Sequence, residues 1–176
     1  MRESRKVSTS SGAGMKFLIE NEMFVVFDME YTAWKGSLER NWEGKGKHPE
    51  IIQLGAVKLA RYGDLTKIDC LDLYVKPRFN TNLSDYITDF TEITNEMIAE
   101  CGVSFGAALM RFTAFCEKTR DIYSFGNDER MLVRDCDLNG VDLPLQFDRF
   151  RDLETPLKEA LALSPKTASS DLVDIL

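Results

Sequence analysis

Segment 24–31, Phe-Val-Val-Phe-Asp-Met-Glu-Tyr, joins an apolar run typical of a buried strand to two acids, Asp28 and Glu30. Side chains alternate across a strand, so both carboxylates should project from one face within a few ångströms of each other. Burying two like charges is costly unless a cation or another partner relieves it. The pair therefore predicts a site for a hard divalent cation. The alternative, in which the two acids face solvent on an edge strand, is disfavoured by the apolar residues at 24–27.

Composition describes an ordinary soluble domain with an acidic surface. The 176 residues are 44% hydrophobic and 29% charged, with a net charge of −7, which fits one domain large enough for a core. Residues 1–14 are polar and read as a flexible arm or a cloning remnant, while 15–176 form the domain. No apolar run reaches the roughly 18 residues of a membrane span, so we expect no membrane partner. The negative charge disfavours nucleic-acid binding by bulk electrostatics, but it permits a cleft in which metal ions offset the acids.

The cysteines and the single histidine limit the chemistry. Cys70, Cys101, Cys116 and Cys136 show no metal-binding spacing, and we interpret them as free thiols, mostly buried, in a reducing cytoplasm. His48 lies in a Gly/Lys-rich loop, which makes enzymes built on a histidine base improbable.

Periodicity predicts an α/β sheet with helices packed on it. Short connections favour an antiparallel meander of the first three strands, and strand–helix units follow. The expected strands are 23–31, 50–59, 70–75, 121–126 and 149–152, and the expected helices are 94–100, 104–118, 128–138 and 155–163. Thr94 and Ser104 are candidate N-caps. The order of the strands does not follow from periodicity.

A third acid, Asp128, follows the strand at 121–126 where a helix begins. Ligand crevices in open α/β sheets form at such junctions. On position alone, a role as helix cap is equally good.

Four motifs together resemble the DEDD (DnaQ-like) 3′–5′ exonucleases, in particular the exoribonuclease-like branch of the histidine-containing (DEDDh) subgroup. They are Phe-Asp-Met-Glu-Tyr-Thr at 27–32, Glu-Ile-Ile-Gln-Leu-Gly-Ala-Val at 50–57, Phe-Thr-Glu-Ile-Thr at 90–94, and Ser-Phe-Gly-Asn-Asp at 124–128 with Leu132 and 134–136. The resemblance covers roughly residues 23–163.

This resemblance implies a ribonuclease-H-like fold with a mixed five-stranded sheet. It further implies two Mg²⁺ or Mn²⁺ ions held by Asp28, Glu30 and Asp128, which would also be the catalytic residues. Met29, Thr32 and Phe125 would contact the terminal nucleotide at the 3′ end of single-stranded RNA or DNA, although a packing role is an equally good interpretation of Phe125. Many relatives pair as dimers, so a homodimer is a further expectation.

One motif of the resembled family has no counterpart in this sequence. The family places a histidine base and a fourth metal-binding Asp after residue 163, but no histidine follows His48. We therefore expect a C-terminally incomplete domain with little or no activity, since general bases contribute about 10²–10⁴-fold.

Two other functions stay open. One is an inactive module of the same fold that binds nucleic acid or protein, and the other is a different metal-dependent phosphohydrolase. The loop at 32–49 mixes Trp34 and Trp42 with basic residues, which suggests base stacking, although a simple exposed insertion is the favoured interpretation.

Overall fold

The computed structural model describes residues 23–37, 40, 42, 47–61 and 65–167. The predicted arm at 1–14 and the end of the chain lie outside these residues. The elements run in the order β1 (Met23–Tyr31), β2 (Ile51–Ala60), β3 (Lys67–Lys76), α2 (Asp85–Thr91), α3 (Asn95–Cys101), β4 (Val103–Ser104), α4 (Phe105–Phe115), β5 (Asp121–Ser124), α5 (Asp128–Asn139), the 3₁₀ turn η1 (Phe147–Arg149), β6 (Phe150–Asp152) and α6 (Glu154–Ala160).

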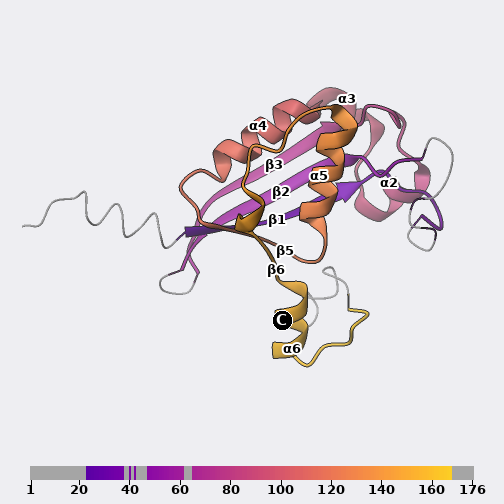
Figure 1. Cartoon of the computed structure of the whole chain (residues 1–176). Helices are drawn as coiled ribbons and strands as arrows, with labels where there is room; N and C mark the ends of the chain where they lie inside the picture. Colours follow the sequence, from indigo (N-terminus) through magenta and orange to yellow (C-terminus); the bar gives the residue numbers. More distant parts are fainter. Residues whose placement is uncertain (1–22, 38–39, 41, 43–46, 62–64, 168–176) are drawn as a thin grey trace, which may run out of the picture.

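One mixed sheet in the order β4-β3-β2-β1-β5-β6 forms the centre of the fold (Figure 1). β1, β2 and β3 are antiparallel neighbours, which confirms the predicted meander. β5 pairs parallel to β1, β6 pairs parallel to β5, and β4 pairs parallel to β3. The sheet has six strands instead of the five expected, because the two-residue β4 is too short to leave a periodic signal.

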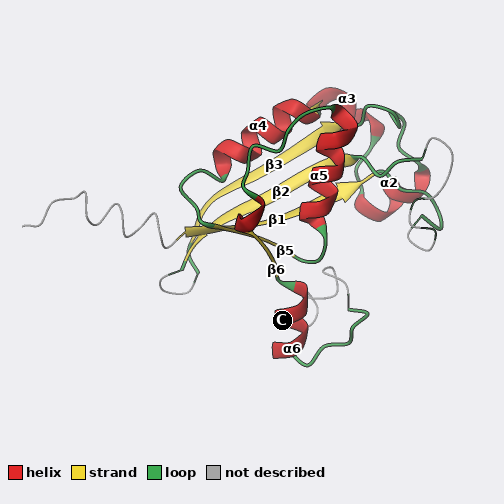
Figure 2. Cartoon of the chain, viewed as in Figure 1, coloured by secondary structure: helices red, strands yellow, loops and turns green. Residues whose placement is uncertain are grey.

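Two apolar clusters hold helices against the sheet. Figure 2 colours the helices red and the strands yellow. The larger cluster joins one face of β1–β3 to α4 and α5, and Phe27 and Phe112 meet there with ring centroids 5.2 Å apart. The smaller one joins Ile52 of β2 to Ile87 of α2 and Ile98 of α3. The two clusters therefore hold different helices against the sheet, α4 and α5 in one and α2 and α3 in the other.

Local signals place most helix starts. Thr94 and Ser104 accept hydrogen bonds from the backbone N–H groups of Met97 and Ala107, so both predicted N-caps are confirmed. Ser84 caps α2 in the same way; this helix was not predicted, although α3, which has the same length, was.

The cysteines are free, as expected, but only Cys116 and Cys136 are buried, whereas Cys70 and Cys101 are exposed. The expectation that most of them are buried is therefore wrong. Cys70 lies on the outer part of β3, where the burial pattern is largely exposed. Within the described residues, no helix is long and apolar enough to cross a membrane.

Candidate active site

The two acids of β1 lie on a central strand. β1 is flanked by β2 and β5, so the edge-strand alternative is wrong. Asp28 pairs with Gly55 of β2, and Glu30 pairs with Gln53. Asp28 is nevertheless exposed and Glu30 is half-buried, so the expected burial of both acids is wrong for Asp28. Gly55 has no side chain, and a Cβ there would meet only the Asp28 carbonyl oxygen at 3.9 Å, which leaves this part of the face open.

Asp128 approaches β1 because β5 ends early. β5 pairs with β1 only from Phe24 to Val26, and the chain then turns at Gly126, whose φ of +91° favours glycine. Helix α5 starts two residues later with Asp128, beside the free edge of β1. This is the type of crevice that forms at the carboxyl ends of strands in open sheets.

Direct contacts tie Asp128 to β1. The Tyr31 hydroxyl donates to Asp128 Oδ1 at 2.9 Å, and the Asp28 and Asp128 carboxyl groups interact with each other. Asp128 Oδ2 is buried and has no hydrogen-bond partner. The N-cap of α5 is Asn127, with no side-chain cap bond, so a capping role does not account for Asp128.

The three acids all resist ionisation. Burial, followed by the charge of Asp28, raises the pKa of Asp128 to about 7, although the Tyr31 hydrogen bond opposes this. Although Asp28 is exposed, partial desolvation of its carboxyl group also raises its pKa, against the hydrogen bonds from the Met29 backbone and Asp128. Burial and then the Asp28 charge raise the pKa of Glu30. A bound cation would relieve this excess of negative charge.

The acids fit a hard divalent cation in part. All donors are carboxylate oxygens, as such cations prefer. Asp128 Oδ2 is an unpartnered acceptor, and the Asp128 carboxyl group interacts with that of Asp28. Glu30 lies two residues along the same face. Within the described residues, however, no three Asp, Glu, His or Cys side chains are grouped tightly enough to hold a metal ion. The structure thus brings Asp28 and Asp128 together and leaves Glu30 beside them.

The three predicted nucleotide-contacting residues have different surroundings. The Met29 side chain is in the apolar core, which leaves its backbone for any contact with a ligand. Thr32 is 1% exposed, and its hydroxyl group donates to the His48 carbonyl oxygen and accepts from Glu50 N–H. Phe125 is half-buried, with Lys158 Nζ 5.5 Å from its ring centroid.

Sequence reasoning missed Tyr31 and the hollow next to Glu30. A hollow of about 170 Å³ lies there, lined by Glu30, Tyr31, Ala33, Ser37, Trp42, Tyr86, Ile87 and Phe90. Its aromatic residues come from β1, the following loop and α2. The tyrosine directly after Glu30 was the signal available in the sequence for a partner of Asp128.

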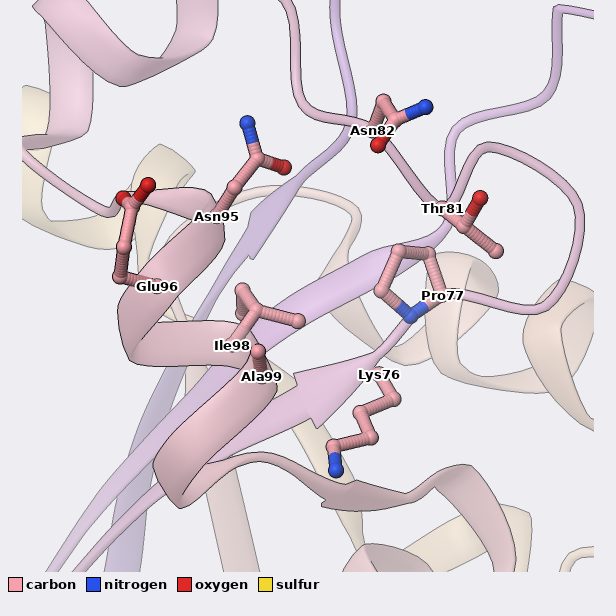
Figure 3. A pocket seen from close by; sticks show the side chains of 8 residues that line it. All are labelled: Lys76, Pro77, Thr81, Asn82, Asn95, Glu96, Ile98 and Ala99. Atoms are coloured by element: carbon pink, nitrogen blue, oxygen red, sulfur yellow. The ribbon is translucent and has the colours of Figure 1, made fainter.

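A wider hollow of about 630 Å³ lies away from these acids, between α3 and the segment after β3. Figure 3 shows Ile98 of α3 facing Pro77 across it, with Lys76 below and Asn95 above. None of the three predicted acids lines it, so its size does not make it the candidate active site.

Asp135 on α5 gives a pH-dependence test away from these acids. It is 2% exposed and accepts a hydrogen bond from Ile51 N–H at 2.8 Å. Burial raises its pKa to about 7; the Ile51 hydrogen bond opposes this rise, and the charge of Glu50 adds to it. Because the folded state binds this proton more tightly than the unfolded state, the contribution of Asp135 to stability falls as pH rises from about 4 to about 7.

We therefore expect the unfolding free energy of Asp135→Asn, relative to that of the parent protein, to be higher at pH 8 than at pH 5. The gain should be on the order of 1–4 kcal/mol, since one pKa unit corresponds to about 1.4 kcal/mol. Urea unfolding at both pH values measures this difference. Asp137→Asn, at an exposed position of the same helix, is the matched control. A parent–variant difference that does not change with pH would contradict the assignment.

The mixed sheet flanked by helices is the ribonuclease-H-like fold. The sequence profile of the RNase_T family, described as Exonuclease, matches residues 25–158. Because the match spans most of the chain, the chain belongs to this family. Family membership supports a nuclease function, and DEDD exonucleases generally use divalent metal ions.

Solved structures show the same fold at low sequence identity. The nuclease domain of 3′hExo, a DEDDh family member bound to rAMP, is 19% identical with a TM-score of 0.68, over 82% of this chain and 72% of that one. Cell-death related nuclease 4 (CRN-4) is 17% identical with a TM-score of 0.65, over 85% of this chain and 52% of that one. Product-bound exonuclease I is 18% identical with a TM-score of 0.60, over 85% of this chain and 34% of that one. No curated protein matches the sequence significantly.

Proposed function

We propose that the chain is a metal-dependent 3′–5′ exonuclease domain that removes nucleotides from the 3′ end of single-stranded RNA or DNA. The observation that carries this proposal is the meeting of Asp28 and Asp128, in which the buried Asp128 Oδ2 has no partner. Like-charged carboxyls in contact are an unfavourable arrangement for a purely structural role. They suit the binding of Mg²⁺ or Mn²⁺.

The roles of the residues follow from their contacts. Asp28, Glu30 and Asp128 would hold two such ions, which lower the pKa of a water molecule and stabilise charge on a phosphodiester when bound. Tyr31 fixes the orientation of Asp128 by its hydrogen bond to Oδ1, which leaves Oδ2 free. The turn at Gly126 sets the position at which α5 begins.

The hollow beside Glu30 supports a nucleotide as the ligand. It places aromatic and apolar side chains next to an acid, and Phe90 is 69% exposed at its edge. Exposed aromatic rings stack on bases without sequence preference. The 3′hExo structure was obtained with rAMP and a related one with a histone mRNA stem-loop, which agrees with a nucleic-acid 3′ end as substrate. We further propose a cytoplasmic location and a homodimer.

An inactive binding module of the same fold is the second candidate. The observation that favours it is the single histidine of the sequence, whose ring packs on Phe79 with centroids 5.9 Å apart. His48 is not among the groups that act on Asp128, which are Tyr31, Asp28 and Glu129. A base for the water is therefore missing among the described residues around Asp128.

A labelled oligonucleotide separates the two candidates. With excess protein and Mn²⁺ or Mg²⁺, we expect a 5′-labelled strand to shorten stepwise, a 3′-terminal label to leave first as a mononucleotide, and EDTA to stop both. The rate should be low, about 10²–10⁴-fold below that of an enzyme with a positioned base. Binding without trimming would favour the inactive module, and internal cleavage would contradict an exonuclease.

A further inference from the structure

An aromatic and basic surface lies next to the proposed active site, on the loop after β1 and the segment after β3. Lys47 Nζ is 5.0 Å from the Trp34 ring centroid, and Arg78 Cζ is 5.1 Å from that of Phe79. The His48 ring meets Phe79 at an interplanar angle of 65°. We call these five residues the Trp34–Phe79 surface.

The Trp34–Phe79 surface is rigidly supported from below. Glu50 is 2% exposed, and its carboxylate accepts from the backbone N–H groups of Arg78, Phe79 and Asn80 at 2.5–2.9 Å. The Asn80 amide donates to the same carboxylate and to the His48 carbonyl oxygen. These bonds fix the loop after β1 and the segment after β3 to each other, so little conformational freedom is lost when a ligand binds.

Two basic side chains lie on this surface, Lys47 and Arg78, although the net charge of the chain is −7. Glu50, the acid that supports them, is buried and bonded as above. Phe79 is also 53% exposed, so its ring is accessible to a base.

The surface is continuous with the site. Thr32 follows Glu30 by two residues, or about 7 Å along a strand, and its hydroxyl donates to the His48 carbonyl oxygen at 2.8 Å. Trp42, which lines the hollow beside Glu30, donates from Nε1 to the Thr32 carbonyl oxygen at 3.0 Å. Thr32 thus joins a wall of the hollow to the segment that carries His48, so the hollow and the Trp34–Phe79 surface share one supporting residue.

We infer that the Trp34–Phe79 surface binds the nucleotides that precede the 3′ end of a single-stranded nucleic acid. Phe79 and Trp34 stack on bases, and Lys47 and Arg78 contact phosphates, which is how sequence-tolerant single-strand sites work. The inference rests on the proposed function for the position of the 3′ end. It predicts that longer single strands bind more tightly than shorter ones.

The test measures binding without catalysis. Fluorescein-labelled oligothymidylate and oligouridylate of about 4 and about 12 nucleotides are titrated with the full chain in EDTA. We expect the parent protein to bind the longer strand of at least one type more tightly. Phe79→Ala should weaken that binding by about 5- to 100-fold, and Arg78→Gln should lower the salt dependence by about one unit of slope. Binding of the shorter strands should change less.

Matched controls separate a local effect from a general one. Phe147 is 57% exposed, and Arg111 is exposed on α4, so Phe147→Ala and Arg111→Gln remove the same residue types elsewhere. The inference is overturned if these controls weaken binding as much as the test variants do, or if the parent protein shows no length dependence. It is also overturned if Mn²⁺-dependent trimming occurs but Phe79→Ala and Arg78→Gln bind both lengths like the parent protein. Length-dependent binding through Phe79 without any trimming would support this inference while the proposed nuclease activity fails.

Discussion

Asp128→Asn abolishes metal-dependent trimming and metal-induced stabilisation, while the domain stays folded. This is the expected result because Asp128 supplies the unpartnered oxygen of the candidate metal site and contacts Asp28. Loss of groups that only support metal ligands costs about 10–100-fold, so loss of a ligand itself should exceed that range. The amide keeps an oxygen that accepts from the Tyr31 hydroxyl, and it removes a negative charge facing Asp28, so folding should not be impaired.

Two measurements are combined for this variant. Trimming of a 5′-labelled strand reports activity, and the rise of the thermal unfolding midpoint with added Mn²⁺ reports binding, because a ligand that binds only the native state stabilises it. Asp72→Asn is the control, since Asp72 pairs with Gly55, the residue that also pairs with Asp28. Asp72 thus lies on the same sheet face, about 10 Å from Asp28. If Mn²⁺ raised the unfolding midpoint of Asp128→Asn as much as that of the parent protein, the assignment of Asp128 as a metal ligand would be wrong.

Glu50→Gln has the largest expected loss of stability. Each carboxylate oxygen of Glu50 accepts two hydrogen bonds, Oε1 from Arg78 and Phe79 and Oε2 from the backbone and side chain of Asn80. Glutamine replaces one oxygen with an NH₂ group, which then faces two donors and leaves them unsatisfied. An unsatisfied buried donor costs about 1–3 kcal/mol, so we expect a loss of about 3 kcal/mol.

Denaturant unfolding measures this loss, and thermal unfolding should show a midpoint about 6–12 °C lower. Glu100→Gln, at an exposed position of α3, controls for the change of charge. Equal stability of Glu50→Gln and the parent protein would show that the segment after β3 does not depend on this carboxylate. The variant also tests the support of the Trp34–Phe79 surface, because Arg78 and Phe79 lose their fixed backbone.

Local patterns in the sequence were sufficient for most of the elements. Apolar runs and alternation identified β1, β2 and β3, and the Thr94 and Ser104 caps marked helix starts correctly. Sequence patterns did not predict β4 and α2, which have two and seven residues. Length alone is not the reason, since α3, also of seven residues, was predicted with its Thr94 cap. Elements this short owe their stability to the neighbours they pack against.

The candidate site divides in the same way. The sequence by itself determined that Asp28 and Glu30 share one face of a strand, since side-chain alternation is a property of the backbone, and that Asp128 begins a helix. Only the tertiary structure decided that Asp28 is exposed, that Asp128 meets Asp28 and Tyr31 about a hundred positions away, and that Glu50 holds the segment after β3. These contacts depend on strand order, on the early end of β5 and on an open face at Gly55. All three arise from pairing between distant segments, which no local pattern encodes.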